Sequence, residues 1–266
     1  MKNILIQRFV IFGLVAFAAA LWNGCSTVPV TGRSQLNLMS AGEEMQLGLT
    51  SFNQLKKETP ISKDAAANAL VQKVGNRIAA VAELPNAQWE FVVFESKEAN
   101  AFCLPGGKVG VYTGILPITK DEAGMATVLG HEVAHAVAHH GGERMSQETL
   151  RQAGNEVLAV SMSNTDPRTQ AIAKMAYGIG TQVGAILPYS RLHESEADEI
   201  GLRYMARAGY DPEAAVGFWQ RFAAYSQRQG GGGVPGFLRT HPTDEKRIQQ
   251  LKTLIPDAKA EYRPAK

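Results

Sequence analysis

The 266-residue sequence has few cysteines, no run of basic residues and no marked excess of either charge. Two cysteines are too few for a disulfide-stabilised scaffold. The 27 Lys and Arg residues nearly balance the 25 Asp and Glu residues, which argues against a nucleic-acid-binding protein. A hydrophobic share of 45% excludes a disordered or collagen-like chain. What remains is a chain with enough apolar material for one or two compact domains.

The amino terminus has the pattern of a secretion signal. Lys2 and Arg8 precede an uncharged apolar run from Phe9 to Trp22. This run is too short for a comfortable membrane span, but it suits the hydrophobic segment of a signal peptide. We therefore predict a signal peptide at residues 1–24. Its removal takes away two bases and no acid, so the mature chain is expected to be neutral.

Cys25 directly follows this segment, and Gly24-Cys25 resembles the end of a bacterial lipobox. Trp22 stands where a lipobox usually has Leu, so ordinary cleavage and an uncleaved anchor are the alternatives to lipidation. We predict lipidation of Cys25, and Ser26 after it favours the periplasmic side of the outer membrane. Cys103 then has no partner within the chain and is expected to be a free, buried thiol.

The rest of the chain reads as one domain of the α+β class, mostly helical with a small sheet. We expect a polar tether at 25–39, a compact domain at 40–258 and a short tail at 259–266, because there is no internal repeat and no later change of composition. Spacing and capping signals predict helices at 41–58, 64–84, 119–140, 168–187 and 188–208, another after Asp211-Pro212, a last one opened by Pro242, and strands at 89–94 and 108–113.

Three of these expectations depend on local signals. Thr119 and Glu122 form a capping box for the helix 119–140, and Gly141-Gly142 is expected to end it. The segment 168–187 is rich in Ala, Gly and Ile, and we expect it to be a tightly packed core or groove-lining helix and not a membrane span. The glycine-rich residues 228–236 predict a flexible loop.

The sequence His131-Glu132-Val133-Ala134-His135 is an HExxH motif in the middle of a predicted helix. Its two histidines lie on one helix face and can share a metal ion, with Glu132 alongside as a base for an attacking water. A chance match is the alternative, since short patterns also occur in unrelated helices. His139 lies about 12 Å beyond His131 on a rigid helix, too far to join both ligands. We expect His139 and His140 to be solvent-facing or structural.

A carboxylate is the natural third ligand of a catalytic zinc ion. The one dense acidic cluster contains Glu194, Glu196 and Asp198. Glu194 and Asp198 share one helix face, whereas Glu196 points away and is expected to be solvated. One of the pair would bind the metal and the other would orient a ligand imidazole or touch the reacting site, and the residues alone leave their order open.

Four segments together resemble one peptidase family: residues 100–116 (NAFCLPGGKVGVYTGIL), 130–146 (GHEVAHAVAHHGGERMS), 190–212 (SRLHESEADEIGLRYMARAGYDP) and 240–248 (THPTDEKRI). The chain is identified by them as a member of metallopeptidase family 48, the HtpX-like gluzincins. The resemblance runs from about residue 29 to 255. It is strongest to the periplasmic lipoprotein proteases of the LoiP and BepA types, without the tetratricopeptide region of the latter, for which the chain ends too soon.

The resemblance implies one Zn²⁺ ion per chain, with Glu194 as its third ligand beside His131 and His135. Asp198 corresponds to a residue often described as a proton donor, although an orienting role is easier to defend. His241 would stabilise an oxyanion or occupy the fourth metal position at rest, and its alternative is a helix N-cap before Pro242.

The same resemblance implies a zinc metalloendopeptidase, with its catalytic domain at 40–258. It would bind unfolded or extended polypeptides along the strand 108–113, as an added β-strand, and act in quality control of envelope proteins. The alternative is a non-proteolytic outer-membrane lipoprotein that acts as a chaperone or assembly factor with a structural zinc site. Against it, a structural site needs no general base such as Glu132. The partners expected are polypeptides and, through the lipid anchor, the membrane, but no nucleic acid; the oligomeric state stays open.

Overall fold

The computed structural model describes residues 25–182, 186–228, 237, 241 and 245–264. The predicted signal peptide and most of the predicted loop 228–236 therefore lie outside the described residues. The chain divides into two compact units, which we describe separately. The hairpin unit comprises residues 25–43 and 139–189, and the core unit comprises residues 44–138 and 190–264. The predicted α+β class, mostly helical with small sheets, is confirmed.

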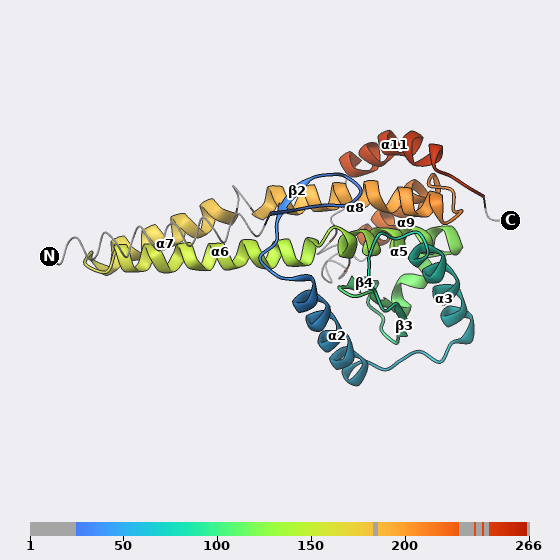
Figure 1. Cartoon of the computed structure of the whole chain (residues 1–266), viewed down its shortest axis with the longest axis horizontal. Helices are drawn as coiled ribbons and strands as arrows, with labels where there is room; N and C mark the ends of the chain where they lie inside the picture. Colours follow the sequence, from blue (N-terminus) through green and yellow to red (C-terminus); the bar gives the residue numbers. More distant parts are fainter. Residues whose placement is uncertain (1–24, 183–185, 229–236, 238–240, 242–244, 265–266) are drawn as a thin grey trace. The chain divides into compact units, whose positions relative to one another are not determined.

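The core unit places helices around a three-stranded sheet (Figure 1). Its elements are α2 (Ala41–Glu58, all but its first residues), α3 (Ala65–Ala79), β3 (Glu90–Phe94), β4 (Ala101–Leu104), β5 (Lys108–Tyr112), the 3-10 turn η1 (Thr113–Ile115), α4 (Leu116–Thr119), α5 (Glu122–Val137), most of α8 (Leu187–Arg207), α9 (Ala214–Arg228) and α11 (Glu245–Ala260). Most of these helices were predicted from apolar spacing, with ends displaced by a few residues.

The sheet has the strand order β3-β5-β4, with β3 and β5 parallel and β4 and β5 antiparallel. The predicted substrate strand, β5, is thus the central strand, and both of its edges are already paired. The expectation that a peptide adds to β5 is wrong for this reason. Within the described residues, β4 pairs on one side only and is the strand next to α5. With four residues, β4 was too short for the alternation that signals a strand.

Helix α5 is the centre of the core unit, because every residue from Gly124 to Val137 is buried. Its N-cap is Asp121, whose side chain accepts a hydrogen bond from the Gly124 amide at 2.8 Å. The predicted cap residue Thr119 instead lies at the end of α4 and donates to the Leu116 carbonyl. Asp121 is the N-cap because it directly precedes the helix and has the extended conformation that an N-cap needs.

The predicted stop at Gly141-Gly142 is also wrong. Helix α5 ends at Val137, and a second helix, α6 (His140–Ser161), begins three residues later. His139 takes the left-handed conformation, with φ of 52°, that usually falls to a glycine at a helix end. Both glycines then lie in the first turn of α6.

Helices α5 and α8 cross at a pair of glycines. A Cβ atom on Gly201 would lie 3.0 Å from the Gly130 carbonyl carbon and from the His131 amide nitrogen. A Cβ atom on Gly130 would lie 2.9 Å from the Gly201 carbonyl oxygen. The two backbones are therefore in contact beside His131. This crossing brings the HExxH motif of α5 and the acidic cluster 194–198 of α8 together.

The hairpin unit consists of two short strands and a pair of long helices. Its elements are β1 (Cys25–Thr27), β2 (Ser34–Leu36), α6 and α7 (Pro167–Thr181), and β1 and β2 are antiparallel. Arg33 binds Glu143 through two hydrogen bonds of 2.8 and 3.1 Å, and the Leu38 amide donates to Ser146 Oγ at 2.9 Å. The residues predicted as a tether thus form β1 and β2 and are tied to α6.

Helices α6 and α7 lie side by side (Figure 1). They meet at Gly154, where a Cβ atom would lie 2.1 Å from Tyr177 Oη, and this hydroxyl donates to the Arg151 carbonyl at 3.1 Å. The expected burial of residues 168–187 is wrong, because α7 has no buried residue. Among the described residues α7 packs mainly against α6, and two helices cannot enclose a core. Among the described residues, no helix has the length and apolar character needed to cross a bilayer.

Candidate metal centre

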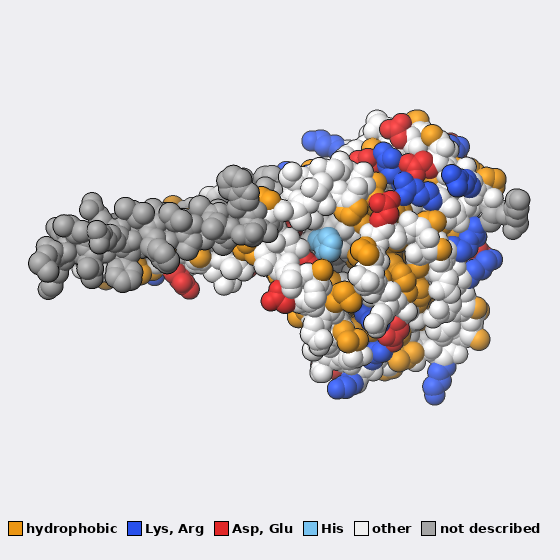
Figure 2. Space-filling view, viewed as in Figure 1, with side chains coloured by type: hydrophobic (Ala, Val, Ile, Leu, Met, Phe, Trp, Pro, Cys, Tyr) orange, Lys and Arg blue, Asp and Glu red, His pale blue; other side chains and the backbone are white. Residues whose placement is uncertain are grey.

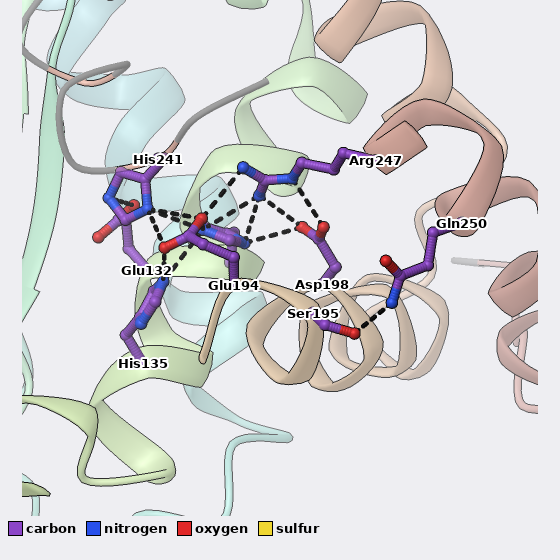
Figure 3. Close-up of polar contacts among 9 residues, drawn as sticks. Glu132, His135, Glu194, Ser195, Asp198, His241, Arg247 and Gln250 are labelled. Carbon is purple, nitrogen blue, oxygen red and sulfur yellow. Dashed lines mark hydrogen bonds and ion pairs between the residues drawn. The ribbon is translucent and has the colours of Figure 1, made fainter. Parts of the chain in front are cut away.

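Four side chains from separate parts of the core unit converge on one point (Figure 3). Helix α5 supplies His131 and His135, α8 supplies Glu194, and His241 lies before α11. His131 Nε2 lies 3.1 Å from His135 Nε2 and 3.1 Å from His241 Nδ1. The Glu194 carboxylate lies 3.0 Å from His241 Nδ1 and 3.4 Å from Nε2 of each of the other two histidines.

This arrangement fits a tetrahedral zinc ion. Nitrogen and oxygen ligands about 2.0–2.1 Å from tetrahedral zinc lie about 3.3–3.4 Å from one another, close to the separations found here. The charges agree as well. Burial lowers the pKa of His131, but hydrogen bonds to Asp198 and Glu194 outweigh it and raise this pKa to about 9. The site therefore stabilises positive charge at the point where the donors converge, and these residues can hold one zinc ion.

Glu132 lies beside this cluster and is buried. Its Oε1 atom accepts no hydrogen bond from any described residue, and His241 Nε2 lies 3.3 Å away. Burial raises the pKa of Glu132, while the nearby histidines act in the opposite direction. A buried carboxylate with a raised pKa and an unused oxygen is suited to take up a proton and release it.

Asp198 lies behind His131 and is held by Arg247. Its Oδ1 atom is 3.0 Å from His131 Nδ1, and Arg247 donates to both of its oxygens at 2.8 Å. Burial raises the pKa of Asp198, but the Arg247 charge and the contacts with His131 hold it below the usual range. An ionised, doubly held carboxylate orients the imidazole and directs Nε2 to the metal position, and it is poorly placed to donate a proton.

Arg247 is the site residue that the sequence analysis missed. Besides Asp198, its guanidinium contacts Glu194 Oε2 at 3.0 Å and lies 3.7 Å from the ring centre of Trp219. It is buried on the inner face of α11, where Ile248 and Leu251 are also buried. The one signal in the sequence was its place in the segment 240–248, which carried the resemblance but no role for this arginine.

The other residues that the sequence singled out differ in how their observed exposure compares with the prediction. Glu196, expected to be solvated, is 5% exposed, because α8 is buried on this side too, as His193 and Ile200 show. His140 is fully buried, which leaves it structural and not solvent-facing. Cys103, expected to be a free and buried thiol, forms no disulfide but is only half-buried. Desolvation and the charge of Glu132 raise the pKa of its thiol, so it stays protonated. Cys25 is exposed at the start of β1.

His241 is the fourth potential metal ligand, beside His131, His135 and Glu194. Four protein donors close a tetrahedral site, whereas a catalytic site keeps one position open. Of its two expected roles, this geometry favours occupation of the fourth position. The alternative, an N-cap before Pro242, falls outside the described residues, and α11 begins at Glu245.

A buried helix with HExxH, a glutamate from the next motif and a small sheet with a strand beside that helix together define a zinc metallopeptidase of the gluzincin type. Residues 65–255 match the family model "Peptidase family M48". The chain belongs to this family, as its motifs indicated.

Curated relatives extend the comparison. The mitochondrial metalloendopeptidase OMA1 of Schizosaccharomyces pombe is 33% identical over 87% of this chain and 66% of its own length. Human OMA1 is 30% identical over 93% of this chain and 49% of its own length. The β-barrel assembly-enhancing protease of Escherichia coli K12 is 26% identical over 94% of this chain and 52% of its own length. The expected similarity to the BepA type is thus present, but these mitochondrial relatives are more similar. The chain spans about half to two thirds of these three proteins.

Proposed function

We propose that the protein is a zinc-dependent endopeptidase that cleaves unfolded or misassembled proteins of the cell envelope. The observation that supports it most is the position of Glu132, buried next to the point where His131, His135 and Glu194 converge. A structural metal site has no use for a buried carboxylate with a raised pKa beside its ligands.

In this mechanism the chain's own residues hold and move a proton. Zinc, when bound, supplies a Lewis acid that polarises the peptide carbonyl and acidifies water. Glu132 takes the proton of the attacking water and delivers it to the leaving amine. Asp198, fixed by Arg247, holds the His131 ring in place. His241 must leave the donor set before a substrate can approach, because its Nδ1 lies 3.1 Å from His131 Nε2.

Strand β4 is the best candidate for substrate binding. It is an edge strand among the described residues and packs on α5, which carries Glu132. Hydrophobic side chains gather over the β3 and β4 region on the visible face of the core unit (Figure 2). A peptide added to β4 would be held by main-chain hydrogen bonds, so extended and unfolded segments would be preferred with little sequence specificity.

We further propose that the protein acts at the periplasmic side of the outer membrane, attached through a lipid on Cys25. The support is the signal-like segment before Cys25, the exposure of this cysteine, and the name of the E. coli relative, a β-barrel assembly-enhancing protease. The mitochondrial relatives indicate that the family is not restricted to one compartment.

Glu132→Gln tests the enzymatic proposal. We expect this variant to bind zinc normally and to lose at least about 100-fold of its activity on unfolded casein, because the general base is removed. Activity and zinc content are measured on the same preparation, with the exposed Glu58→Gln as the matched control. Full activity of Glu132→Gln would overturn the mechanism, and full complementation by an inactive variant in cells would favour a chaperone.

A further inference from the structure

The hairpin unit exposes apolar side chains to an unusual degree. Among the described residues, five large hydrophobic side chains are more than half exposed, and all of them lie on α6 or α7. They are Val157 (69%), Val160 (74%), Ile172 (59%), Met175 (66%) and Ile179 (59%). Soluble surfaces carry scattered apolar residues, but a concentration of this kind on one pair of helices marks a site of interaction.

The charge of this region narrows the choice of partner. From residue 152 to 182 the charged residues are Glu156, Asp166, Arg168 and Lys174, two of each sign. The hairpin therefore offers no electrostatic field for an acidic or basic macromolecule. On α7, Ile172, Met175 and Ile179 follow at intervals of three and four residues, so they form one apolar stripe. A partner must therefore be recognised by apolar contact.

The amino-terminal segment indicates which apolar partner is within reach. Residues 25–43 belong to the same compact unit as α6 and α7, and Arg33 and Leu38 are bonded to Glu143 and Ser146 of α6. The chain before β1 contains the apolar run from Phe9 to Trp22. Whether the proposed anchor is a lipid on Cys25 or this run itself, it lies at or directly before residues 25–43, which are hydrogen-bonded to α6.

We propose that the α6–α7 hairpin docks on the lipid bilayer and inserts the stripe Ile172, Met175 and Ile179, together with Val157 and Val160, into its interface. This inference rests on the membrane attachment proposed above. A diacylated Cys25 or the apolar run would already hold the protein at a bilayer, and an apolar contact from the hairpin would add to that attachment. With the anchor in the same unit, the second contact forms at high effective concentration.

The test introduces a tryptophan probe into the full-length protein. Met175→Trp on the hairpin is compared with Ile61→Trp, a half-exposed position of the core unit, in vesicles of phosphatidylcholine and phosphatidylglycerol. Trp22 where it is retained, Trp89 and Trp219 contribute the same background to both proteins. We expect lipids with brominated acyl chains to quench the added fluorescence of Met175→Trp several-fold more than that of Ile61→Trp. Equal quenching at the two positions would overturn the proposal.

Two further measurements separate the outcomes. Vesicle flotation of the wild-type protein and of Cys25→Ser tests the anchor. Loss of attachment is thereby distinguished from failure of the hairpin to insert. The emission spectrum of the same tryptophan is also recorded without lipid, first at rising protein concentration and then with unfolded casein. A blue shift with concentration alone would assign the stripe to a second copy of the chain, and one with casein alone to substrate; each would overturn docking on lipid. Casein hydrolysis by Met175→Trp in detergent verifies that the core unit is folded.

Discussion

At the scale of single residues, the site depends on one buried arginine. Arg247 is in contact with an orienting carboxylate, a ligand carboxylate and an aromatic ring, which are Asp198, Glu194 and Trp219. Its planar fork matches the two Asp198 oxygens and cannot be reproduced by a lysine. The geometry of His131 is therefore controlled from α11, which contributes no metal ligand of its own.

Arg247→Lys is expected to weaken zinc binding by about 10- to 100-fold, because it removes the two-point hold on Asp198 that fixes the His131 ring. Arg247→Leu should be worse and should also lower the free energy of unfolding by about 3–5 kcal/mol, since it leaves buried carboxylates without a partner. Competition with a chromogenic chelator measures the affinity, and Lys246→Leu at the exposed neighbouring position is the control. Unchanged affinity in Arg247→Lys would show that the arginine only stabilises the fold.

The candidate metal ligands and Glu132 could be predicted from the sequence, because the residue types and spacing of HExxH and of the downstream acids indicate a metal site. Arg247 was not, because its role depends on which face of α11 becomes buried. The same reason explains Glu196, whose solvation was assumed from the helix face opposite Glu194. Helix α8 is buried on several sides because the core unit packs around it. The residue types at 194–198 alone do not indicate this burial.

At the scale of elements, the crossing of α5 and α8 sets the distance between the two halves of the metal site. The helices touch through Gly130 and Gly201, next to His131 and one turn from Asp198. Each glycine has low intrinsic helix propensity, so its presence within a helix is explained by this close approach. The sequence indicated both helices but not their crossing.

Gly201→Ala is expected to lower the free energy of unfolding by about 1–3 kcal/mol, because its Cβ would press on the backbone of α5 at His131. Zinc affinity should fall with it. Gly178→Ala on α7 is the matched control, since nothing lies within 4 Å of the added methyl group, and it should be neutral or stabilising by up to about 1 kcal/mol. Urea unfolding of both variants measures the difference. Equal effects of the two substitutions would contradict the close crossing.

Two elements escaped the sequence analysis for local reasons. Strand β4 has four residues, too few for a periodic signal. Helix α6 was hidden because Gly141-Gly142 looked like a helix end, whereas His139 provides the left-handed residue that separates α5 from α6. The second error concerns a connection, where the backbone conformation of one residue determines whether a helix ends, and residue type predicts that conformation poorly.

At the scale of the whole molecule, the metal site links elements that are distant in the sequence. His131 and Glu194 are separated by the entire helical hairpin, and His241 follows after α9. When a metal ion binds only to the folded chain, it stabilises that state by mass action. The free energy of the core unit is thereby coupled to the supply of zinc.

Removal of zinc by a chelator is expected to lower the free energy of unfolding of the core unit, by about 2.7 kcal/mol relative to protein at a free zinc concentration of 100 times Kd. Calorimetry with and without chelator measures the shift in the midpoint. His135→Ala, which lacks a ligand, should unfold at nearly the same temperature in both conditions. If the wild-type midpoint also stayed fixed, zinc would not be bound by the folded chain.

The excursion of the chain between His139 and Tyr189 has one more consequence. It leaves the core unit directly after α5 and returns within α8, four residues before Glu194. All four convergent donors remain outside it. The hairpin is therefore a module inserted between two catalytic motifs, and its length and surface are free to diverge while the chemistry stays constant. If the hairpin docks on a bilayer as proposed, substitutions in this insertion alone would change where such a peptidase attaches and leave its metal site intact.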